Sequence, residues 1–158
     1  MKVGEKVTAS PRLGEIGLEN FAPYLMNRIM GRYNASLRQE MTALGLTTPK
    51  MRALAVLSAV DGILIRERAV YAVVEQSTLS RALDALVTDG LVRRETDITD
   101  SRAVRIFLAA EGRQAYDRLW PHMMASYSHM FGGISENEQR AFVVTLQKML
   151  SNIRQHDF

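Results

Sequence analysis

The sequence predicts a mainly α-helical fold that carries one small β-hairpin. Apolar residues recur at helical spacing along most of the 158 residues, which is the pattern of helices that bury one face. Residues 91–108 instead show the period-two alternation of two strands around a polar turn. The composition, 47% hydrophobic and 23% charged, is typical of a globular chain with one domain or two small lobes.

Composition and motifs exclude several classes of protein. The chain has no cysteine, so disulfide frameworks and thiolate metal sites are excluded. No apolar run is long enough to span a membrane, and the first residues lack the apolar core of a secretory signal. A cytoplasmic protein without a membrane partner is therefore expected.

The sequence also lacks the motifs of catalysis. It contains no nucleophile elbow, phosphate-binding glycine loop or metalloprotease helix. His122 and His129 lie on one helical face, but nothing nearby in the sequence completes a metal-ligand set. We expect no enzyme activity, no cofactor and no metal.

The N-terminal part is predicted to be a flexible arm followed by a long helix. Residues 1–18 mix small and polar types without periodicity, which favours an arm. Residues 19–46 are predicted to form a dimerisation helix, with Pro23 in its first turn and Gly45 at its end. Its apolar stripe consists of Phe21, Leu25, Ile29, Leu37, Met41 and Leu44. So broad a stripe suggests burial against two surfaces, one of them on a second subunit.

Two helices are predicted next. Thr48 followed by Pro49 is the pattern of an N-cap and first helical residue, and this helix should end at Asp61–Gly62. A second short helix is predicted from Ile63 to about Val73.

The next helix, which begins near Glu75, carries the residues that point to a ligand. Its apolar positions have the spacing of one buried stripe: Leu79, Ala82, Leu83, Leu86 and Val87. The opposite face presents Ser77, Arg81, Asp84 and Thr88, with Thr78 and Ser80 on its flanks. Short hydroxyls permit close approach to DNA, and a guanidinium can bond two acceptors of a guanine edge. The alternative is an ordinary surface helix in which Arg81 pairs with Asp84.

A hairpin follows this helix directly. Residues 91–96 and 103–108 are predicted strands around a polar turn that contains Arg102. A helix-turn-helix followed by such a hairpin is the winged form of the motif, so residues 47–109 are predicted to be a winged helix-turn-helix DNA-binding domain. Strand alternation lets only some of Arg93, Arg94 and Arg105 face DNA, and Arg94 could instead pair internally.

Residues 110–158 are predicted to form two C-terminal dimerisation helices. The first runs from Glu111 to about Phe131 and should bend at Pro121, and the second begins at the capping box of Ser135 and Glu138. A monomer of this size has few ways to bury all the apolar stripes, so packing in a two-fold homodimer is expected. Such a dimer would present two recognition helices to half-sites about one DNA turn apart.

The overall charge says little about the partner. The chain carries a net charge of +3, but acidic residues equal the arginines in number from Arg66 to Arg105. Affinity for DNA must therefore come from the arrangement of charges. A winged-helix protein–protein interaction module remains the alternative function.

Three local strings carry a resemblance to a known family: Gln-Ser-Thr-Leu-Ser-Arg at 76–81, Leu-Val-Thr-Asp-Gly-Leu-Val at 86–92, and Asp-Ser-Arg-Ala at 100–103. In this order and spacing the chain resembles the multiple antibiotic resistance regulator (MarR) family of bacterial transcription factors, over roughly residues 19–155. The resemblance implies a homodimer, often a repressor, on a pseudo-palindromic DNA operator. Members commonly lose DNA affinity when a small aromatic or phenolic ligand binds between the dimer helices and the winged lobe.

The resemblance assigns roles by position. It implies that Asp100 orients Arg102, which would reach the minor groove or its phosphates. The major-groove residues would be Gln76, Ser77, Thr78, Ser80 and Arg81, and Arg93 and Arg105 complete the candidate DNA-contacting set. Tyr24, Tyr33 and Tyr71 are candidates for the ligand pocket, with ordinary core packing as the alternative. The chain departs from the family pattern at Val73, where relatives often have Gly, and at Ala109, where they often have a Thr N-cap.

Overall fold

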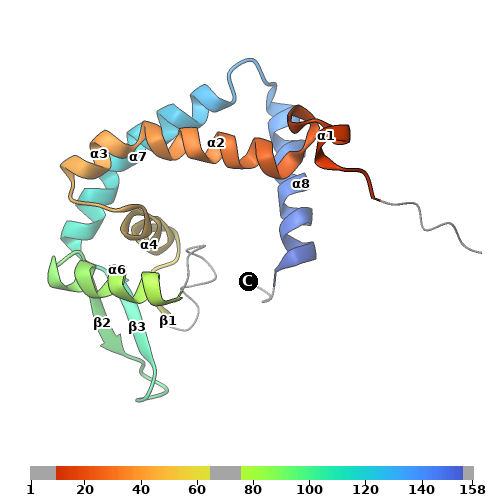
Figure 1. The fold of residues 1–158 in the computed structure, drawn as a ribbon. Helices are drawn as coiled ribbons and strands as arrows, with labels where there is room; N and C mark the ends of the chain where they lie inside the picture. Colours follow the sequence, from red (N-terminus) through yellow and green to blue (C-terminus); the bar gives the residue numbers. More distant parts are fainter. Residues whose placement is uncertain (1–9, 65–75, 155–158) are drawn as a thin grey trace, which may run out of the picture. The chain divides into compact units, whose positions relative to one another are not determined.

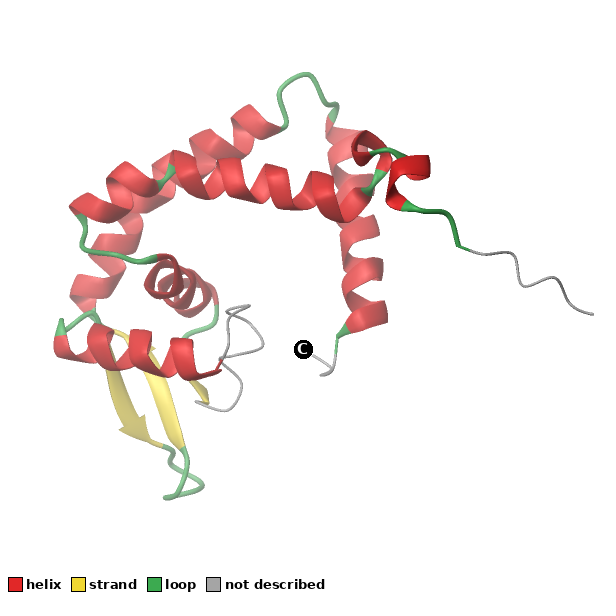
Figure 2. Ribbon diagram, in the orientation of Figure 1, coloured by secondary structure: helices red, strands yellow, loops and turns green. Residues whose placement is uncertain are grey.

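A computed structural model describes residues 10–64 and 76–154 of the chain, and it is largely helical with one small sheet (Figures 1 and 2). Two compact units divide the chain, residues 1–35 and 36–158, and each is described by itself. The elements in chain order are α1 (Leu13–Ile16), η1 (Leu18–Asn20), α2 (Ala22–Ser36), α3 (Arg38–Ala43), α4 (Thr48–Ala59), β1 (Ile63–Leu64), α6 (Gln76–Thr88), β2 (Val92–Thr96), β3 (Val104–Leu108), α7 (Ala110–Met130) and α8 (Glu136–Ile153).

The first unit contains α1, η1 and α2. The prediction of an arm through residue 18 was wrong at its end, because residues 13–16 form a helical turn. The Glu15 carboxylate accepts a hydrogen bond from the backbone N–H of Arg12 at 2.9 Å, which satisfies a donor that the helix itself leaves open. The apolar residues of α2 include Leu25, Ile29 and Met30, which remain exposed.

The predicted continuous helix over residues 19–46 is interrupted. Helix α2 begins only at Ala22, and Leu37 separates it from α3. The side chain of Leu37 is fully buried and that of Met41 nearly so, so the interruption places both in the core of the second unit. Gly45 follows α3 with a φ of 68°, in agreement with the predicted helix end.

The second unit packs helices against a three-stranded antiparallel sheet of order β1-β3-β2. Its fully buried side chains come from the residue before α3 and from α4, α6, β3 and α7: Leu37, Leu54, Leu57, Leu79, Leu86, Ile106 and Leu119. Contacts join α4 to α6, α7 and β3, and α6 to β2. The core therefore fixes the position of α6 relative to the hairpin.

Two sequence predictions about this unit need correction. Ile63 does not begin a helix but pairs with Ile106 as part of β1, where the sheet satisfies its backbone groups and buries its side chain. The N-cap of α4 is Thr47 rather than Thr48, and its hydroxyl accepts from the backbone N–H of Lys50 at 3.4 Å. Residues 65–73 of the predicted short helix lie outside the described residues.

The C-terminal helices follow the predictions closely. Pro121 lies within α7, and the capping box of α8 is formed, with Ser135 Oγ accepting from Glu138 N at 3.3 Å and Glu138 Oε2 accepting from Ser135 N at 3.0 Å. The carboxylate of Glu138 accepts from both the backbone N–H and the hydroxyl of Ser135, and these two bonds hold the pKa of Glu138 below its usual value. Helix α8 has no buried residue. None of the helices in the described residues is long and apolar enough to cross a membrane.

Candidate nucleic-acid interface

Helix α6 has the two faces that its spacing predicted. Leu79, Leu83 and Leu86 are buried in the core of the second unit. Ser77, Arg81, Asp84 and Thr88 are exposed on the opposite side, and Thr78 and Ser80 are partly exposed between the two faces. Gly90 closes the helix with a φ of 75°. The turn before α6, including Val73, lies outside the described residues, as does the environment of the Gln76 side chain.

Arg81 is available for an external partner. Within residues 10–64 and 76–154 its guanidinium makes no ion pair or hydrogen bond. The alternative pairing with Asp84 is not formed, because the Asp84 carboxylate pairs instead with Arg94 of β2. This pair confirms the internal role that was open for Arg94, and it ties the exposed face of α6 to the hairpin.

The sheet register explains which strand arginines lie together. Val92, Arg94, Ile106 and Leu108 share one face, because Val92 pairs with Leu108 and Arg94 with Ile106. Arg93 and Arg105 lie on the other face. The guanidinium of Arg93 pairs with Glu95 at 2.7 Å, donates to the carbonyl of Leu108 at 3.1 Å and lies over the Phe107 ring.

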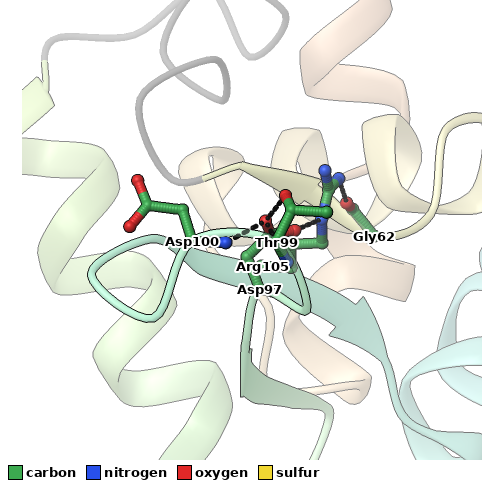
Figure 3. A network of polar contacts seen from close by, with 5 residues as sticks. All are labelled: Gly62, Asp97, Thr99, Asp100 and Arg105. Carbon is green, nitrogen blue, oxygen red and sulfur yellow. Dashed lines mark hydrogen bonds and ion pairs between the residues drawn. The ribbon is translucent and has the colours of Figure 1, made fainter.

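Arg105 is engaged even more deeply within the protein (Figure 3). Its Nη1 donates to the backbone carbonyl of Gly62 at 2.6 Å, and its Nε bonds Asp97. Gly62 has a φ of 74°, and an added Cβ would lie 2.7 Å from the Phe107 ring, so this turn requires glycine. Sequence reasoning missed both sets of internal contacts, because partners across strands depend on a register that the sequence does not reveal.

The tip of the hairpin is held by acidic side chains. Asp97 Oδ2 accepts from Thr99 Oγ1 at 2.6 Å, from Thr99 N at 3.2 Å and from Asp100 N at 3.1 Å. The Thr99 hydroxyl, followed by Arg105, holds the pKa of Asp97 well below its usual range. Asp100 Oδ1 accepts from the backbone N–H of Arg102 at 3.0 Å and lies 3.8 Å from its Nε. The geometry fits an orienting role for Asp100.

Arg102 projects from this ordered turn. Its side chain is 94% exposed, and the loop that carries it extends away from α4, α6 and α7 (Figure 2). One unit thus presents a polar helix face and an exposed arginine at the end of a hairpin. Such groups can bond base edges and phosphate oxygens, respectively.

Two of the three candidate ligand-pocket residues lie in the described part of the chain. Tyr24 and Tyr33 lie on α2, where the Tyr24 hydroxyl accepts from Arg28 at 3.3 Å, and Tyr71 lies outside the described residues. Their shared role stays a prediction. His122 Nδ1 lies 3.3 Å from Glu40 Oε1, and no group of three or more metal-ligand residues occurs in the described part of the chain.

Comparisons with known proteins identify similar chains. The MarR family's sequence profile matches residues 44–103. A crystal structure of a MarR-family transcriptional regulator from Silicibacter pomeroyi is 65% identical, with a TM-score of 0.88, over 94% of this chain and 100% of that one. The transcriptional repressor IacR of Pseudomonas putida is 23% identical over 90% of this chain and 86% of its own. BpsR of Bordetella bronchiseptica, whose DNA binding is regulated by 6-hydroxynicotinic acid, has the same fold, with 23% identity and a TM-score of 0.69 over 81% of this chain and 97% of its own.

Proposed function

Because this chain belongs to the MarR family of transcriptional regulators, we propose that it is a homodimeric repressor that binds a pseudo-palindromic operator and is released by a small aromatic ligand. Residues 47–109 would bind DNA, and residues 19–46 and 110–158 would form the dimer. The observation that carries the proposal is the exposed polar face of α6 beside a hairpin that ends in an exposed arginine.

The exposed face of α6 supports reading of the major groove. Arg81 lies in the N-terminal half of α6 (Gln76–Thr88), and residues in this part of a recognition helix commonly contact base edges. Its guanidinium has no partner among the described residues, so no internal bond opposes a bidentate contact with guanine. The flanking Ser77 and Thr78 are short enough to let the helix backbone approach the bases.

The wing supports a contact with the neighbouring minor groove or its phosphates. Arg102 is exposed, and its backbone N–H is fixed by Asp100 at 3.0 Å. An arginine contributes both a bidentate donor set and a permanent positive charge. Arg93 and Arg105 would contribute less directly, since both guanidiniums already bond groups within the hairpin or the adjoining turn.

The terminal helices support a homodimer. Six apolar residues of α8 are exposed in the single chain: Phe142, Val143, Val144, Met149, Leu150 and Ile153. A helix of this length with no buried residue gains little stability alone, and a two-fold partner would cover its apolar positions. Apolar patches of this kind mark protein interfaces.

Release by a small ligand rests on the family and on BpsR, whose DNA binding responds to 6-hydroxynicotinic acid. In this chain the aromatic side chains Tyr24 and Tyr33 of α2, together with Tyr71, are the proposed contacts. The hydroxyl of a tyrosine can form a hydrogen bond with a phenolic or aromatic acid, and its ring can stack on the aromatic ring of that acid.

Selection of bound sequences from random duplex DNA tests the function. The expected result is a two-fold-symmetric site with half-site centres about ten base pairs apart and an affinity that falls as the salt concentration rises. Added aromatic acids should then lower the affinity for that site. If the purified, ligand-free dimer enriches no sequence, the DNA-binding proposal fails and a protein–protein module becomes the better explanation.

A further inference from the structure

We propose that Arg105 is a positioning residue that orders the wing tip through Asp97 and thereby presents Arg102 to DNA, without contacting DNA itself. The inference rests on the proposed function, in which Arg102 meets the minor groove or its phosphates. It replaces a direct DNA contact of Arg105 with an indirect role.

The guanidinium of Arg105 is committed to two partners inside the protein. Nη1 donates to Gly62 O at 2.6 Å, and Nε bonds Asp97 Oδ1 (Figure 3). The arginine side chain is 39% exposed and that of Asp97 only 9%. A movement of the guanidinium toward a phosphate would stretch or break these two bonds and leave a mostly covered carboxylate without its partner. Loss of one partner of such a charge-assisted pair is costly.

Asp97 connects this arginine to the turn. Oδ1 faces Arg105, while Oδ2 accepts from Thr99 Oγ1 at 2.6 Å, from Thr99 N at 3.2 Å and from Asp100 N at 3.1 Å. One carboxylate therefore joins β3 to residues 99 and 100. Because the carboxylate is the acceptor in every one of these bonds, it must stay ionised to make them all.

The hydrogen bonds of the wing tip continue from Asp97 to the exposed Arg102. Asp100 Oδ1 accepts from Arg102 N at 3.0 Å, so bonded groups run from Gly62 through Arg105, Asp97 and Asp100 to Arg102. A turn that is ordered before DNA arrives loses less conformational entropy on binding than a loose one. The tip would therefore bind more tightly while Arg105 anchors it.

Arg105 also neutralises a charge that would oppose binding. Asp97 and Asp100 both lie in the tip beside Arg102, so an unpaired Asp97 would add a negative charge where DNA phosphates approach. Glu95 lies directly across the sheet from Arg105 in the register, but its carboxylate is paired with Arg93. Glu95 therefore does not take the place of Asp97.

A double-mutant cycle between Arg105 and Arg102 tests the inference. Wild type, R105Q, R102A and the double variant are titrated with the selected operator by fluorescence anisotropy at two salt concentrations. R105Q should weaken binding about five- to tenfold in the wild-type background, the equivalent of one charge-assisted contact. In the R102A background, R105Q should lower the operator affinity less than about twofold, because its effect acts through Arg102. R118Q removes an exposed arginine from α7 and controls for net charge.

The possible results separate the explanations. Equal losses from R105Q in both backgrounds would show an independent DNA contact and overturn the inference, as would no loss in the wild type. If R102A binds like the wild type, the proposed role of Arg102 fails first, and the role of Arg105 fails with it. R105K supplies a second readout that does not depend on loss of charge. A phosphate contact would survive in R105K, whereas a two-sided anchor that needs the guanidinium fork would not.

Discussion

Replacement of Arg81 by alanine separates reading of DNA from folding more cleanly than any other change on α6. Arg81 is exposed, and within the described ranges it bonds nothing. Its removal should therefore leave the free energy of unfolding within about 0.5 kcal/mol of wild type. Any large loss of operator affinity must then come from the missing contact with DNA.

The size of that loss follows from the geometry available to the guanidinium. Arg81 has no internal bond to break, so a bidentate contact with guanine should yield its full discrimination of about 1–3 kcal/mol, or about five- to 150-fold in affinity. Arg81→Lys keeps the charge but loses the planar fork. It should retain the salt dependence of binding while losing most of the base preference.

The assay is competition between the selected operator and variants changed at one base pair in each half-site. Wild type should reject one such change strongly, and Arg81→Ala should bind that variant and the original operator almost equally. Arg118→Ala, which also removes an exposed charge, should keep the wild-type preference. If Arg81→Ala keeps the full preference at every position, Arg81 is not a base-reading residue and the assignment of the α6 face must be revised.

Three further changes test the fold, the wing and the dimer. Gly112→Ala should destabilise the protein by about 1–3 kcal/mol or more in chemical denaturation, because a Cβ would overlap the Leu91 carbonyl. Gly31→Ala, with open space around it, should not, and a stable Gly112→Ala would contradict the packing. The lowered pKa of Asp97 stabilises the fold fully above pH ~4 and progressively less as the pH falls below it. Asp97→Asn should therefore flatten the acid side of the plot of Tm against pH, and an unchanged slope would refute the network. Leu150→Lys on exposed α8 should dissociate the dimer in sedimentation while Asn152→Lys does not, and a dimer that survives Leu150→Lys would place the interface elsewhere.

The faces of α6 were predictable from sequence, whereas the interruption at Leu37 was not. Spacing alone distinguishes Leu79 and Leu86 from Arg81, because a single helix sets their angles. Residues 19–46 carry an apolar stripe that continues through Leu37, and neither Gly nor Pro marks the break. Only packing in the second unit explains why this leucine is fully buried.

The wing shows a second limit of sequence reasoning. The alternation of side chains along a strand correctly indicated that Arg94 could pair within the protein, and Arg94 does pair with Asp84 of α6. It could not identify the partners of Arg93, which depend on the strand register, or those of Arg105, which depend on the turn at Gly62 and on the conformation of residues 97–100. Direct DNA contact by these two arginines is an untested prediction, and their internal bonds favour a supporting role.

Ion pairs explain why the segment that carries the candidate DNA-contacting residues is nearly neutral. Each acidic residue between 76 and 105 lies within 4.0 Å of a basic partner: Asp84 with Arg94, Asp89 with Lys50, Glu95 with Arg93, Asp97 with Arg105, and Asp100 with Arg102. Arg81 remains as the unpaired cation of this range, and Arg102 has the longest of these pairings, at 3.8 Å, and a 94% exposed side chain. The acids thus pair with the cations that support the structure, leave Arg81 without a partner, and hold Arg102 only through a long contact on an exposed side chain. A protein built this way should make few phosphate contacts per subunit, so its salt dependence should be weaker than that of a strongly basic DNA-binding domain. Its specificity should depend on where Arg81 and Arg102 are held rather than on total charge.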